Sequence, residues 1–426
     1  MISNNKQKIC IVGLGYVGLP LAIAFAKKFR VVGFDIDKSR IQDLKNANDK
    51  TFEVEEKLLK SLKLNIKYTS NIQDTSQCNI YIITVPTPID KANLPDLKPL
   101  QKSSLAVGSV LKKNDIVIYE STVFPGATEE ICAPILESHS DLQLNRDFYL
   151  GYSPERINPG DKEHRLAKVK KLISGSTPEI TNVINNLYKQ IILAGTYKVS
   201  KIKIAEAAKV IENIQRDVNI ALINEFSIIF NKLNIDTESV LEAAETKWNF
   251  IPFRPGLVGG HCIGVDPYYL TYKALELGYD PKMIVAGRKL NDSMGTYVVN
   301  QVIKLMNKKK INVNNSNVLI MGLTFKENCP DLRNTKVINI IDSFKKHNCN
   351  LDIYDPWVNP SEAMNKYKIK IIDRPEEKKY DVILLTVAHD KFKKLSLEQL
   401  KNFAKDNHVI YDIKYILKAK EVDGRL

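Results

Sequence analysis

The segment 254–270, RPGLVGGHCIGVDPYYL, combines residues that could do chemistry with a composition suited to a loop. Cys262 and Asp266 lie four positions apart, and His261 follows two adjacent glycines. A glycine-rich stretch between prolines suits neither a core strand nor a helix, which argues against a buried structural cysteine. A metal site would need further ligands, and none with ligand spacing accompanies the pair, so no metal is expected. The favoured interpretation is a nucleophilic thiolate held against a substrate carbonyl.

Two other segments carry polar residues in places suited to a site. The stretch YSPERINPG (152–160) puts Glu155 and Arg156 in a loop flanked by prolines. Lys209 and Asn213 are four positions apart in a helical pattern, so they share one face of that helix. A lysine on a helix is most often exposed to solvent, so its position on the helix alone favours a solvated Lys209 over a functional one.

The segment GLGYVG near the start of the chain predicts a dinucleotide site. Gly13, Gly15 and Gly18 have the GxGxxG spacing, after an apolar run at 9–12 and before a helical pattern. The first glycine permits the tight turn, the second lets a pyrophosphate approach the backbone, and the third lets the helix pack closely. Asp35 ends the next apolar run, where its carboxylate would accept hydrogen bonds from the ribose and repel a 2′-phosphate. The predicted cofactor is therefore NAD rather than NADP.

Arg40 and two threonine-containing loops complete the predicted cofactor site. Arg40 is an argument against NAD, because an arginine near the ribose could bind the 2′-phosphate of NADP. Asp35 is the stronger argument for NAD, because it lies at the end of the second predicted strand, where the ribose hydroxyls bind. The loops TVPTP (84–88) and STVFPG (121–126) follow predicted parallel strands, so they emerge at the carboxyl edge of the sheet, where ligands bind. Their threonines could meet a ligand or serve only the turns. The cofactor contacts expected here are Gly13, Gly15, Tyr16, Val17, Gly18, Asp35, Arg40, Thr84, Pro86, Thr87 and Thr122.

The elements that must position these residues follow an α/β pattern. In residues 1–200 apolar runs alternate with amphipathic stretches, which implies right-handed crossovers and a parallel sheet covered on both faces. From residue 201 a helical period continues for over thirty residues without glycine or proline, and such a helix spans about 45 Å. Strand and helix patterns alternate again beyond residue 300. We predict two Rossmann-like doubly wound domains, 1–200 and 305–426, joined by a long central helix and a helical dimerisation region at 201–304.

The composition limits the class of protein. An apolar content of 44% and a charged content of 26% over 426 residues are typical of a soluble globular protein with two or three domains. The net charge of +13 comes largely from dispersed lysines. The sequence has no arginine-rich run of the kind that would indicate a nucleic-acid partner, so we expect none. Six scattered cysteines without a CxxC pair favour a reducing, cytoplasmic compartment. Residues 6–26 resemble a signal peptide in composition, but cleavage after them would remove the glycine motif GLGYVG. We therefore expect this segment to be part of the folded protein, and we expect no membrane partner.

NAD together with a nucleophilic cysteine narrows the reaction. Oxidation of an alcohol needs only a base, whereas oxidation of an aldehyde to an acid benefits from a thiol. The thiohemiacetal carries a transferable hydride and yields a thioester that water can hydrolyse. The pair therefore predicts oxidation of an alcohol to an acid through two hydride transfers. A two-electron hydroxyacid dehydrogenase and a non-catalytic protein that senses NAD or binds nucleic acid remain alternatives.

Along its whole length the chain resembles the nucleotide-sugar 6-dehydrogenases, the family that includes UDP-glucose dehydrogenase. The motifs follow the family's order: GLGYVGLPLA, VPTP, STVFPG, SPER, AEAAKVIEN, RPGLVGGHCIGVDPYYL and GLTFKENCPDLRNT. The resemblance implies a first Rossmann-like domain for NAD and a second for the UDP part of a UDP-sugar. It also implies a long helix at the core of a homodimer or higher oligomer.

The resemblance also implies roles for the matching residues. Cys262 corresponds to the nucleophile, Lys209 to the group that stabilises the developing oxyanion, and Asn213 to its helper. Thr122, Glu155 and Asp266 match residues that position or activate water and take up protons. Arg333 matches a cofactor contact. The implied substrate contacts are Glu155, Arg156, Lys209, Asn213, Arg254, Gly256, Gly259 and Lys326, of which Arg254 and Gly256 sometimes act across the subunit interface.

The loop around Cys262 departs from the UDP-glucose branch, which has a serine before the cysteine and a Pro-Lys pair before the aspartate. His261 and Gly264–Val265 stand there instead, as in enzymes that act on UDP-N-acetylhexosamines and feed capsule and O-antigen synthesis. We expect an NAD-dependent, four-electron oxidation of the C6 hydroxyl of such a sugar to the uronic acid. UDP-glucose and UDP-N-acetylmannosamine are alternative substrates. The configuration of the sugar and the role of His261 stay open.

Overall fold

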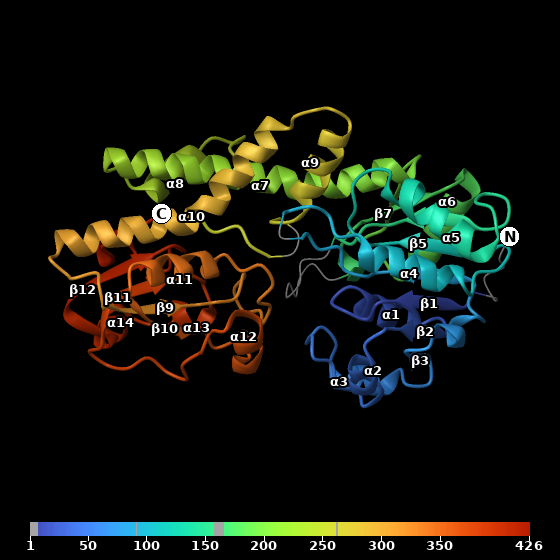
Figure 1. Ribbon diagram of the computed structural model, residues 1–426, viewed down its shortest axis with the longest axis horizontal. Coiled ribbons are helices and arrows are strands. Elements are labelled where there is room, and N and C mark those ends of the chain that lie inside the picture. The colour runs from blue at the N-terminus through green and yellow to red at the C-terminus, as the bar shows by residue number, and fades with distance from the viewer. Residues whose placement is uncertain (1–6, 91, 157–165, 261–262) are drawn as a thin grey trace. The chain divides into compact units, whose positions relative to one another are not determined.

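A computed structural model describes residues 7–90, 92–156, 166–260 and 263–426 of the chain, drawn in Figure 1. The chain forms two compact units. Unit 1 contains Met1–Glu212 and Tyr268–Tyr279, and unit 2 contains Asn213–Pro267 and Asp280–Leu426. The finer division predicted at residues 200 and 305 stays a prediction. The predicted nucleophile Cys262 and its neighbour His261 lie outside the described residues.

Unit 1 is built on an eight-stranded sheet of order β3-β2-β1-β4-β5-β6-β7-β8. All neighbouring strands are parallel except β6 and β7. The central strands β1, β4 and β5 are continuous apolar runs that are buried along their whole length, as burial on both faces requires. The strands are β1 (Ile9–Val12), β2 (Val31–Phe34), β3 (Ile66–Thr69), β4 (Ile80–Ile83), β5 (Ile116–Tyr119), β6 (Tyr149–Tyr152), β7 (Lys171–Gly175) and β8 (Thr196–Lys198).

The helices of unit 1 begin where the sequence supplies caps. The Asp37 side chain accepts hydrogen bonds from the first amides of α2, and the Thr177 side chain caps α6 ahead of Pro178. A π-turn at Thr128–Cys132 leads into α5. The helices are α1 (Gly18–Ala26), α2 (Lys38–Lys45), α3 (Glu56–Ser61), α4 (Lys98–Gly108), α5 (Ala133–Ser140), α6 (Pro178–Tyr188) and α9 (Asp266–Glu276), the last of which starts in unit 2.

Unit 2 repeats the plan with a five-stranded parallel sheet of order β10-β9-β11-β12-β13. The chain runs from β9 out to β10 and then crosses to β11 on the other side of β9, so the strand order switches between β9 and β11. Ligands of doubly wound sheets bind at the carboxyl ends of the strands beside such a switch. The strands are β9 (Asn317–Met321), β10 (Asn350–Tyr354), β11 (Tyr380–Leu385), β12 (Ala404–Asp412) and β13 (Gly424–Arg425).

Helices cover the sheet of unit 2, as Figure 1 shows for α11 and α13. Helix α11 is strongly amphipathic and buries Val337, Ile341 and Phe344 against the sheet. The helices lying wholly in unit 2 are α8 (Thr237–Glu245), α10 (Lys282–Lys308), α11 (Val337–Lys346), α12 (Pro360–Tyr367), α13 (Asp390–Lys393) and α14 (Leu397–Phe403). The α/β fold with two Rossmann-like sheets is therefore confirmed.

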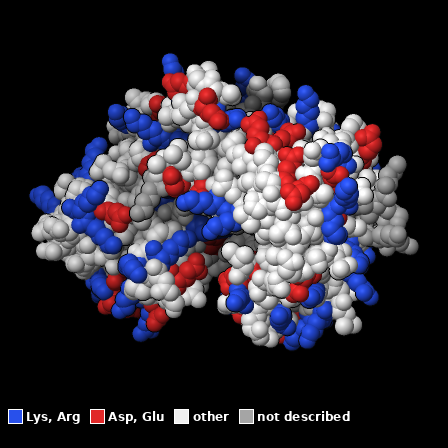
Figure 2. Space-filling view, turned by 45° about the vertical axis from the view of Figure 1, so that its right-hand side comes forward, with Lys and Arg blue, Asp and Glu red and all other residues white. Residues whose placement is uncertain are grey.

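The predicted long helix is also confirmed. Helix α7 runs for 32 residues, Ile202–Leu233, and its residues are divided between the two units. Helix α10, with 27 residues, was not predicted, because its glycines and mixed polar residues hide a buried face at Met294, Val298 and Val302. No described helix is long and apolar enough to cross a membrane. Basic and acidic side chains are interspersed over much of the face in Figure 2.

Candidate functional site

The glycine turn after β1 has the geometry of a dinucleotide site. Gly13 has a φ of +92°, and a Cβ on Gly18 would lie 1.8 Å from the carbonyl oxygen of Gly13. Both positions therefore need glycine for reasons internal to the protein. A Cβ on Gly15 would meet nothing within 4 Å, so no packing in the described chain requires a glycine there. The open space at Gly15 is what a pyrophosphate approaching the backbone would use.

Asp35 follows β2 and is already part of this turn. Its carboxylate accepts hydrogen bonds from the backbone N–H groups of Leu14 (2.8 Å) and Asp37 (2.9 Å). Arg40 donates from Nε to the carbonyl of Leu14 at 2.9 Å and pairs with Asp49 at 2.8 Å. Arg40 thus braces the turn from within the protein, which weakens the case for a 2′-phosphate partner. The residues of this turn fit NAD.

Side-chain hydrogen bonds fix the two threonine loops of unit 1. Thr84 donates to the carbonyl of Gly13 at 2.8 Å, so it ties the loop after β4 to the glycine turn. Thr87 donates to the carbonyl of Thr122 at 2.7 Å and links the TVPTP loop to the STVFPG loop. Pro86 between them is exposed. These predicted cofactor residues therefore gather at the carboxyl ends of β1, β4 and β5, while Tyr16 and Val17 lie partly buried just before α1.

Glu155 lies beside a buried ionic cluster that sequence reasoning missed. Its Oε2 is 3.2 Å from Nζ of Lys171, and the same ammonium is 2.6 Å from Oε2 of Glu120. The Tyr188 hydroxyl donates to the other oxygen of Glu120 in a short hydrogen bond. In the sequence, the sign of this cluster is a charged residue directly beside each of two apolar runs: Glu120 follows IVIY, and Lys171 precedes LISG.

Burial sets the protonation of this cluster. Burial and the charge of Glu155 raise the pKa of Glu120 to about 7, although Lys171 opposes the rise. Burial alone would lower the pKa of Lys171, but the carboxylates of Glu120 and Glu155 raise it above its ordinary value. Lys171 is therefore a fixed positive charge behind Glu155. Arg156 faces elsewhere, with its guanidinium 2.7 Å from Glu212.

The first turns of α7 supply a buried carboxylate and a buried lysine. Glu206 accepts hydrogen bonds from the backbone N–H groups of Gly126 (2.5 Å) and Thr128 (3.0 Å), which fixes the end of the STVFPG loop. Lys209 is only 6% exposed, and no ion pair of Lys209 is found among the described residues. A buried ammonium without a carboxylate is costly unless a ligand supplies the negative charge. The solvated-lysine interpretation of Lys209 is therefore wrong.

Within unit 2, Asn213 and Asp266 are brought together. The Asn213 amide donates a short hydrogen bond to Oδ2 of Asp266, which is buried at the start of α9. Asp266 is thus a buried carboxylate whose orientation is fixed by an amide. A general base must be held in a fixed orientation near the reacting group, so this arrangement suits that role.

The loop that leads to Cys262 is held by a network of buried amides. Asn224 on α7 accepts from the N–H of Gly256 at 2.8 Å and donates to its carbonyl at 3.0 Å. The same amide donates to Asn291 on α10 at 2.8 Å, and Asn291 donates to the Asp217 carboxylate at 2.8 Å. Arg288 closes the network with a 2.6 Å contact to Asp217. Helices α7 and α10 thereby fix the backbone of the loop at Gly256.

The glycine pair at 259–260 allows this loop to approach a second one. A Cβ on Gly259 would lie 2.7 Å from the Asn334 carbonyl, and one on Gly260, whose φ is +85°, would lie 2.8 Å from the Phe325 ring. The N–H of Gly260 donates to the Asn334 carbonyl at 3.4 Å. The glycines that precede His261 and Cys262 are therefore needed for contact with the loop after β9.

Three lysines surround a small crevice at the switch point of the second sheet. Lys326 follows β9, Lys414 follows β12, and Lys336 precedes α11. The crevice measures about 20 Å³, enough for a water molecule. Burial lowers the pKa of Lys414, which was not predicted because it lacks a motif. Glu327 lines the same crevice and Lys336 pairs with Asp292 at 2.7 Å, so carboxylates balance part of this charge. The positive charge that remains at this edge suits a phosphate.

The two predicted arginines of unit 2 are held by carboxylates in their own chain. Arg254 contacts Glu238 at 2.7 Å and forms a short pair with Glu245, both on α8. Arg333 donates from Nε to Asp331 at 2.9 Å and from its terminal nitrogen at 2.5 Å. Their proposed roles toward substrate and cofactor stay predictions.

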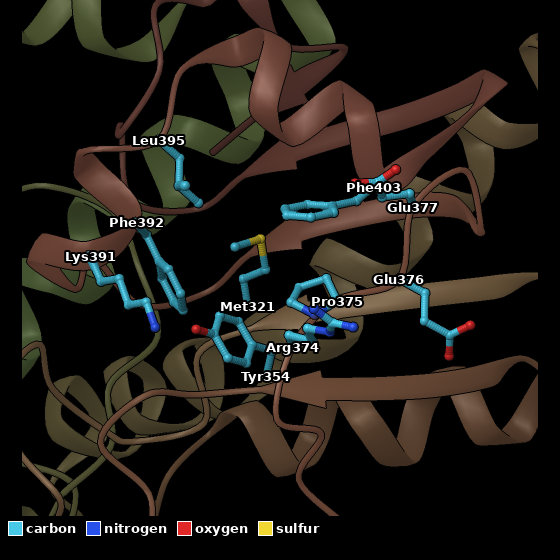
Figure 3. A pocket seen from close by; sticks show the side chains of 10 residues that line it. All are labelled: Met321, Tyr354, Arg374, Pro375, Glu376, Glu377, Lys391, Phe392, Leu395 and Phe403. Atoms are coloured by element: carbon cyan, nitrogen blue, oxygen red, sulfur yellow. The ribbon is translucent and has the colours of Figure 1, made fainter.

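Another hollow of unit 2, shown in Figure 3, contains none of the predicted residues. It measures about 610 Å³ and has apolar side chains from Met321, Tyr354, Phe392 and Phe403. Arg374 and Glu376 at its rim are exposed and of opposite sign, so its charges do not select one ligand.

The comparisons with known proteins cover nearly the whole chain. The family models for the UDP-glucose/GDP-mannose dehydrogenase family match as an NAD binding domain at 7–192, a central domain at 203–293 and a UDP binding domain at 319–419. The chain is 59% identical over 419 residues to UDP-N-acetyl-D-glucosamine 6-dehydrogenase of Pseudomonas aeruginosa, covering 98% of this chain and 99% of the relative. It is 57% identical over 426 residues to the same-named protein of Salmonella typhi, covering 100% of both. The solved UDP-D-ManNAc dehydrogenase of Pyrococcus horikoshii has a TM-score of 0.89 at 29% identity, covering 98% of both chains.

Proposed function

Because the chain belongs to the UDP-glucose/GDP-mannose dehydrogenase family, we propose that it oxidises the C6 hydroxyl of UDP-N-acetyl-D-glucosamine to the uronic acid. The chain is an NAD-dependent nucleotide-sugar 6-dehydrogenase. The observation that carries the choice of sugar is the end-to-end identity of 57–59% with two proteins named for that substrate. Relatives named for UDP-N-acetyl-D-mannosamine are only 30–31% identical, so that sugar is the second candidate.

We place the cofactor on the glycine turn of unit 1. When bound there, NAD would supply the acceptor for the hydride removed in each of the two oxidation steps. Gly15 leaves room for the pyrophosphate, and Asp35 offers its carboxylate to the ribose hydroxyls. The threonines of the two loops would line the nicotinamide side of the site, since they sit at the carboxyl ends of β4 and β5.

Cys262, with Lys209 and Asn213 of α7, would carry the covalent step. The thiolate attacks the aldehyde carbon and forms a thiohemiacetal, and loss of a hydride from that carbon leaves a thioester. The buried Lys209 ammonium would stabilise the oxyanion formed in this attack and again during hydrolysis, and the Asn213 amide would donate to the same oxygen. An ammonium that is buried and has no ion pair among the described residues is suited to this task, because it acts where water is excluded.

Hydrolysis of the thioester needs a base and a fixed water. Glu155, Thr122 and Asp266 are the proposed groups: a carboxylate takes the proton from water while the water oxygen bonds to the thioester carbon. The carbon–sulfur bond then breaks and the Cys262 thiolate is released. The UDP part would bind over the loops that follow β9 and β12 in unit 2, where Lys326 and Lys414 line a crevice that by itself has room only for a water molecule.

We further propose that two copies associate through α7. Its exposed apolar residues recur within about 40° of one another around the helix, at 3.6 residues per turn. These residues are Ile204, Ile211, Leu222, Ile229 and Leu233. An apolar stripe of this length on one helix fits a partner helix better than it fits solvent. The described cysteines are all free and buried, which fits the cytoplasm as the site of action.

The test is a count of NADH released per sugar by the purified enzyme. We expect two NADH and one uronic acid per UDP-N-acetyl-D-glucosamine, with lower kcat/KM for the N-acetylgalactosamine, N-acetylmannosamine and glucose analogues. One NADH per sugar would instead indicate a two-electron dehydrogenase. Preference for the mannosamine analogue would favour the second candidate.

A further inference from the structure

The loop after β9 starts from a turn that repeats the glycine turn of unit 1. Gly322 has a φ of +111°, and Gly13 has a φ of +92°. The Thr386 hydroxyl donates to the Gly322 carbonyl at 2.7 Å. Thr84 makes the equivalent bond to Gly13 in unit 1 at 2.8 Å. Unit 2 therefore contains a second copy of the backbone turn on which we place NAD in unit 1.

The carboxylate of this second turn is used by the protein itself. Asp355 follows β10, as Asp35 follows β2. It accepts the backbone N–H groups of Leu323 at 2.6 Å and Thr324 at 3.0 Å. Nε2 of His389 lies 3.1 Å from the same carboxylate, and both side chains are 0% exposed. A ribose that approached Asp355 would have to displace the buried imidazole, so this turn holds a segment of its own chain instead.

His389 also holds the far end of the loop after β9. Its Nδ1 accepts the backbone N–H of Asn328 at 3.0 Å. A ring nitrogen that accepts carries no hydrogen, so the imidazole donates from Nε2, toward Asp355. The Asn328 side chain accepts the N–H of Asp390 at 3.1 Å, at the start of α13. His389 and Asn328 thus form a reciprocal clamp between the loop after β9 and α13.

The segment between the turn and the clamp carries residues that line the predicted substrate site. The Thr324 hydroxyl donates to the Lys326 carbonyl at 2.9 Å, which fixes the backbone between the two ends. Lys326 lines the crevice described above, and the Phe325 ring lies against Gly260. The His389 side chain is fully buried, so it can act on a ligand only through this loop.

We propose that His389 is a positioning residue for the UDP part of the substrate: its clamp with Asn328 keeps the loop after β9 in the conformation that presents Lys326 to the diphosphate. The inference rests on the proposed function, which places the UDP part over this loop. A loop that is fixed before the ligand arrives loses less conformational freedom on binding. If the clamp is released, the apparent affinity falls by the fraction of time that the loop spends in the binding conformation.

The test is the affinity of the full-length enzyme for UDP, measured by isothermal titration calorimetry. In His389→Ala we expect the Kd for UDP and the KM for the UDP-sugar to rise about tenfold or more, with kcat changed less than about threefold. KM for NAD should stay within about twofold, because the clamp lies in unit 2 and the glycine turn in unit 1. An equal rise in both KM values, or a loss of kcat alone, would show that His389 is only structural.

Two near-isosteric variants separate the bonds of the imidazole. His389→Asn places an amide oxygen where Nδ1 lies and keeps the acceptor for Asn328, so it should restore most of the UDP affinity. His389→Gln places an amide nitrogen near Nε2 and keeps only the donor to Asp355, so its affinity should stay low. The opposite order would overturn the role of the clamp. His347→Ala, at an exposed histidine of unit 2, is the control and should match the wild type.

Asn328→Gly tests the other half of the clamp. Glycine suits the φ of +54° at this position, and the change removes only the acceptor for Asp390. The Kd for UDP should rise about threefold or more, because the loop is then held by one bond fewer. Circular dichroism establishes whether each variant folds. If His389→Ala does not fold, Asn328→Gly decides, and an unchanged Kd there overturns the inference.

Lys414→Met separates this inference from the proposed function. Weaker UDP binding in Lys414→Met, with unchanged binding in both clamp variants, would remove only the role of His389. Unchanged binding in all three variants, or no binding of UDP by the wild type, would remove the proposed UDP site and this inference with it.

Discussion

At the scale of single residues, the chemistry depends on side chains whose types were evident but whose surroundings were not. Lys209 had the weakest signal in the sequence, yet it is buried with no ion pair among the described residues. Arg254 and Arg333 had stronger motif support, and carboxylates of their own unit hold both. Burial and pairing, rather than residue type, separate a group that awaits a ligand from one that is already satisfied.

Replacing the predicted nucleophile should stop the reaction after the first oxidation. In Cys262→Ser we expect acid formation to fall at least about a thousandfold, because the alkoxide needed for the second step is far less available than a thiolate. Measuring NADH and uronic acid per sugar by chromatography checks this. Cys349→Ser, at a buried cysteine of unit 2, should retain most activity. A normal acid yield from the first variant would refute the covalent role.

Lys414 should contribute to binding of the UDP part. Lys414→Met should raise KM for the UDP-sugar by about tenfold or more with a smaller change in kcat, since a charge-assisted phosphate contact contributes about 1.5–3 kcal/mol equally before and during the reaction. Initial rates over a range of UDP-sugar concentrations measure the effect. Lys420→Met, at an exposed lysine, is the control and should match the wild type. An unchanged KM in Lys414→Met would exclude this lysine from the site.

At the scale of elements, long helices position the loops that carry the predicted site. The buried network of Asn224, Asn291 and Asp217 fixes the loop before Cys262 at Gly256. Only the backbone of Gly256 is held by this network, through both its N–H and its carbonyl. The next glycines, at 259 and 260, can therefore adopt the close approach to Phe325 and Asn334. The order of the loop therefore originates in two helices distant from it in sequence.

Removal of the Asn224 amide should loosen this loop. Asn224→Leu leaves the N–H and carbonyl of Gly256 without partners, so we expect a loss of about 2–3 kcal/mol in the free energy of unfolding. We also expect a fall in kcat, because the loop carries the nucleophile. Urea denaturation and steady-state rates provide the two measurements. Asn219→Leu should cost much less, because among the described residues the Asn219 amide bonds only to Gln215 of its own helix. Equal stability of the two variants would contradict a special role of Asn224.

The sequence was enough to predict the strands, the glycine turn and α7, because each rests on local pattern. The run IYII is short, apolar and followed by a proline-rich loop, which favours a buried strand, and the period of over thirty residues in α7 favours a long helix. Helix α10 and the Glu120–Lys171 pair were missed for a different reason. Lys171 and Glu120 are 51 positions apart, and their contact depends on the placement of β5 beside β6 and β6 beside β7. Such long-range pairs leave no local signature.

At the scale of the whole molecule, the exposed stripe on α7 predicts a dimer. Leu222→Glu together with Ile229→Glu should convert a dimer to monomers, because each would bury an unpaired carboxylate in the interface. Sedimentation or light scattering measures the mass. Leu64→Glu is the control: it makes the same change at a side chain that is 97% exposed and lies far from α7 in sequence, and it should leave the mass unchanged. An unchanged mass in the double variant would place the interface elsewhere.

The brace of Arg40 has a consequence for redesigning coenzyme preference. Asp49, its partner, also accepts hydrogen bonds from the N–H groups of Thr51, Glu53 and Val54, so one carboxylate organises the whole turn that follows. An engineer who removed Asp35 to admit a 2′-phosphate would find the nearest guanidinium already committed. Recruiting it would break its ion pair with Asp49 and leave that buried carboxylate without its cation. A switch to NADP is therefore expected to need more than the loss of Asp35.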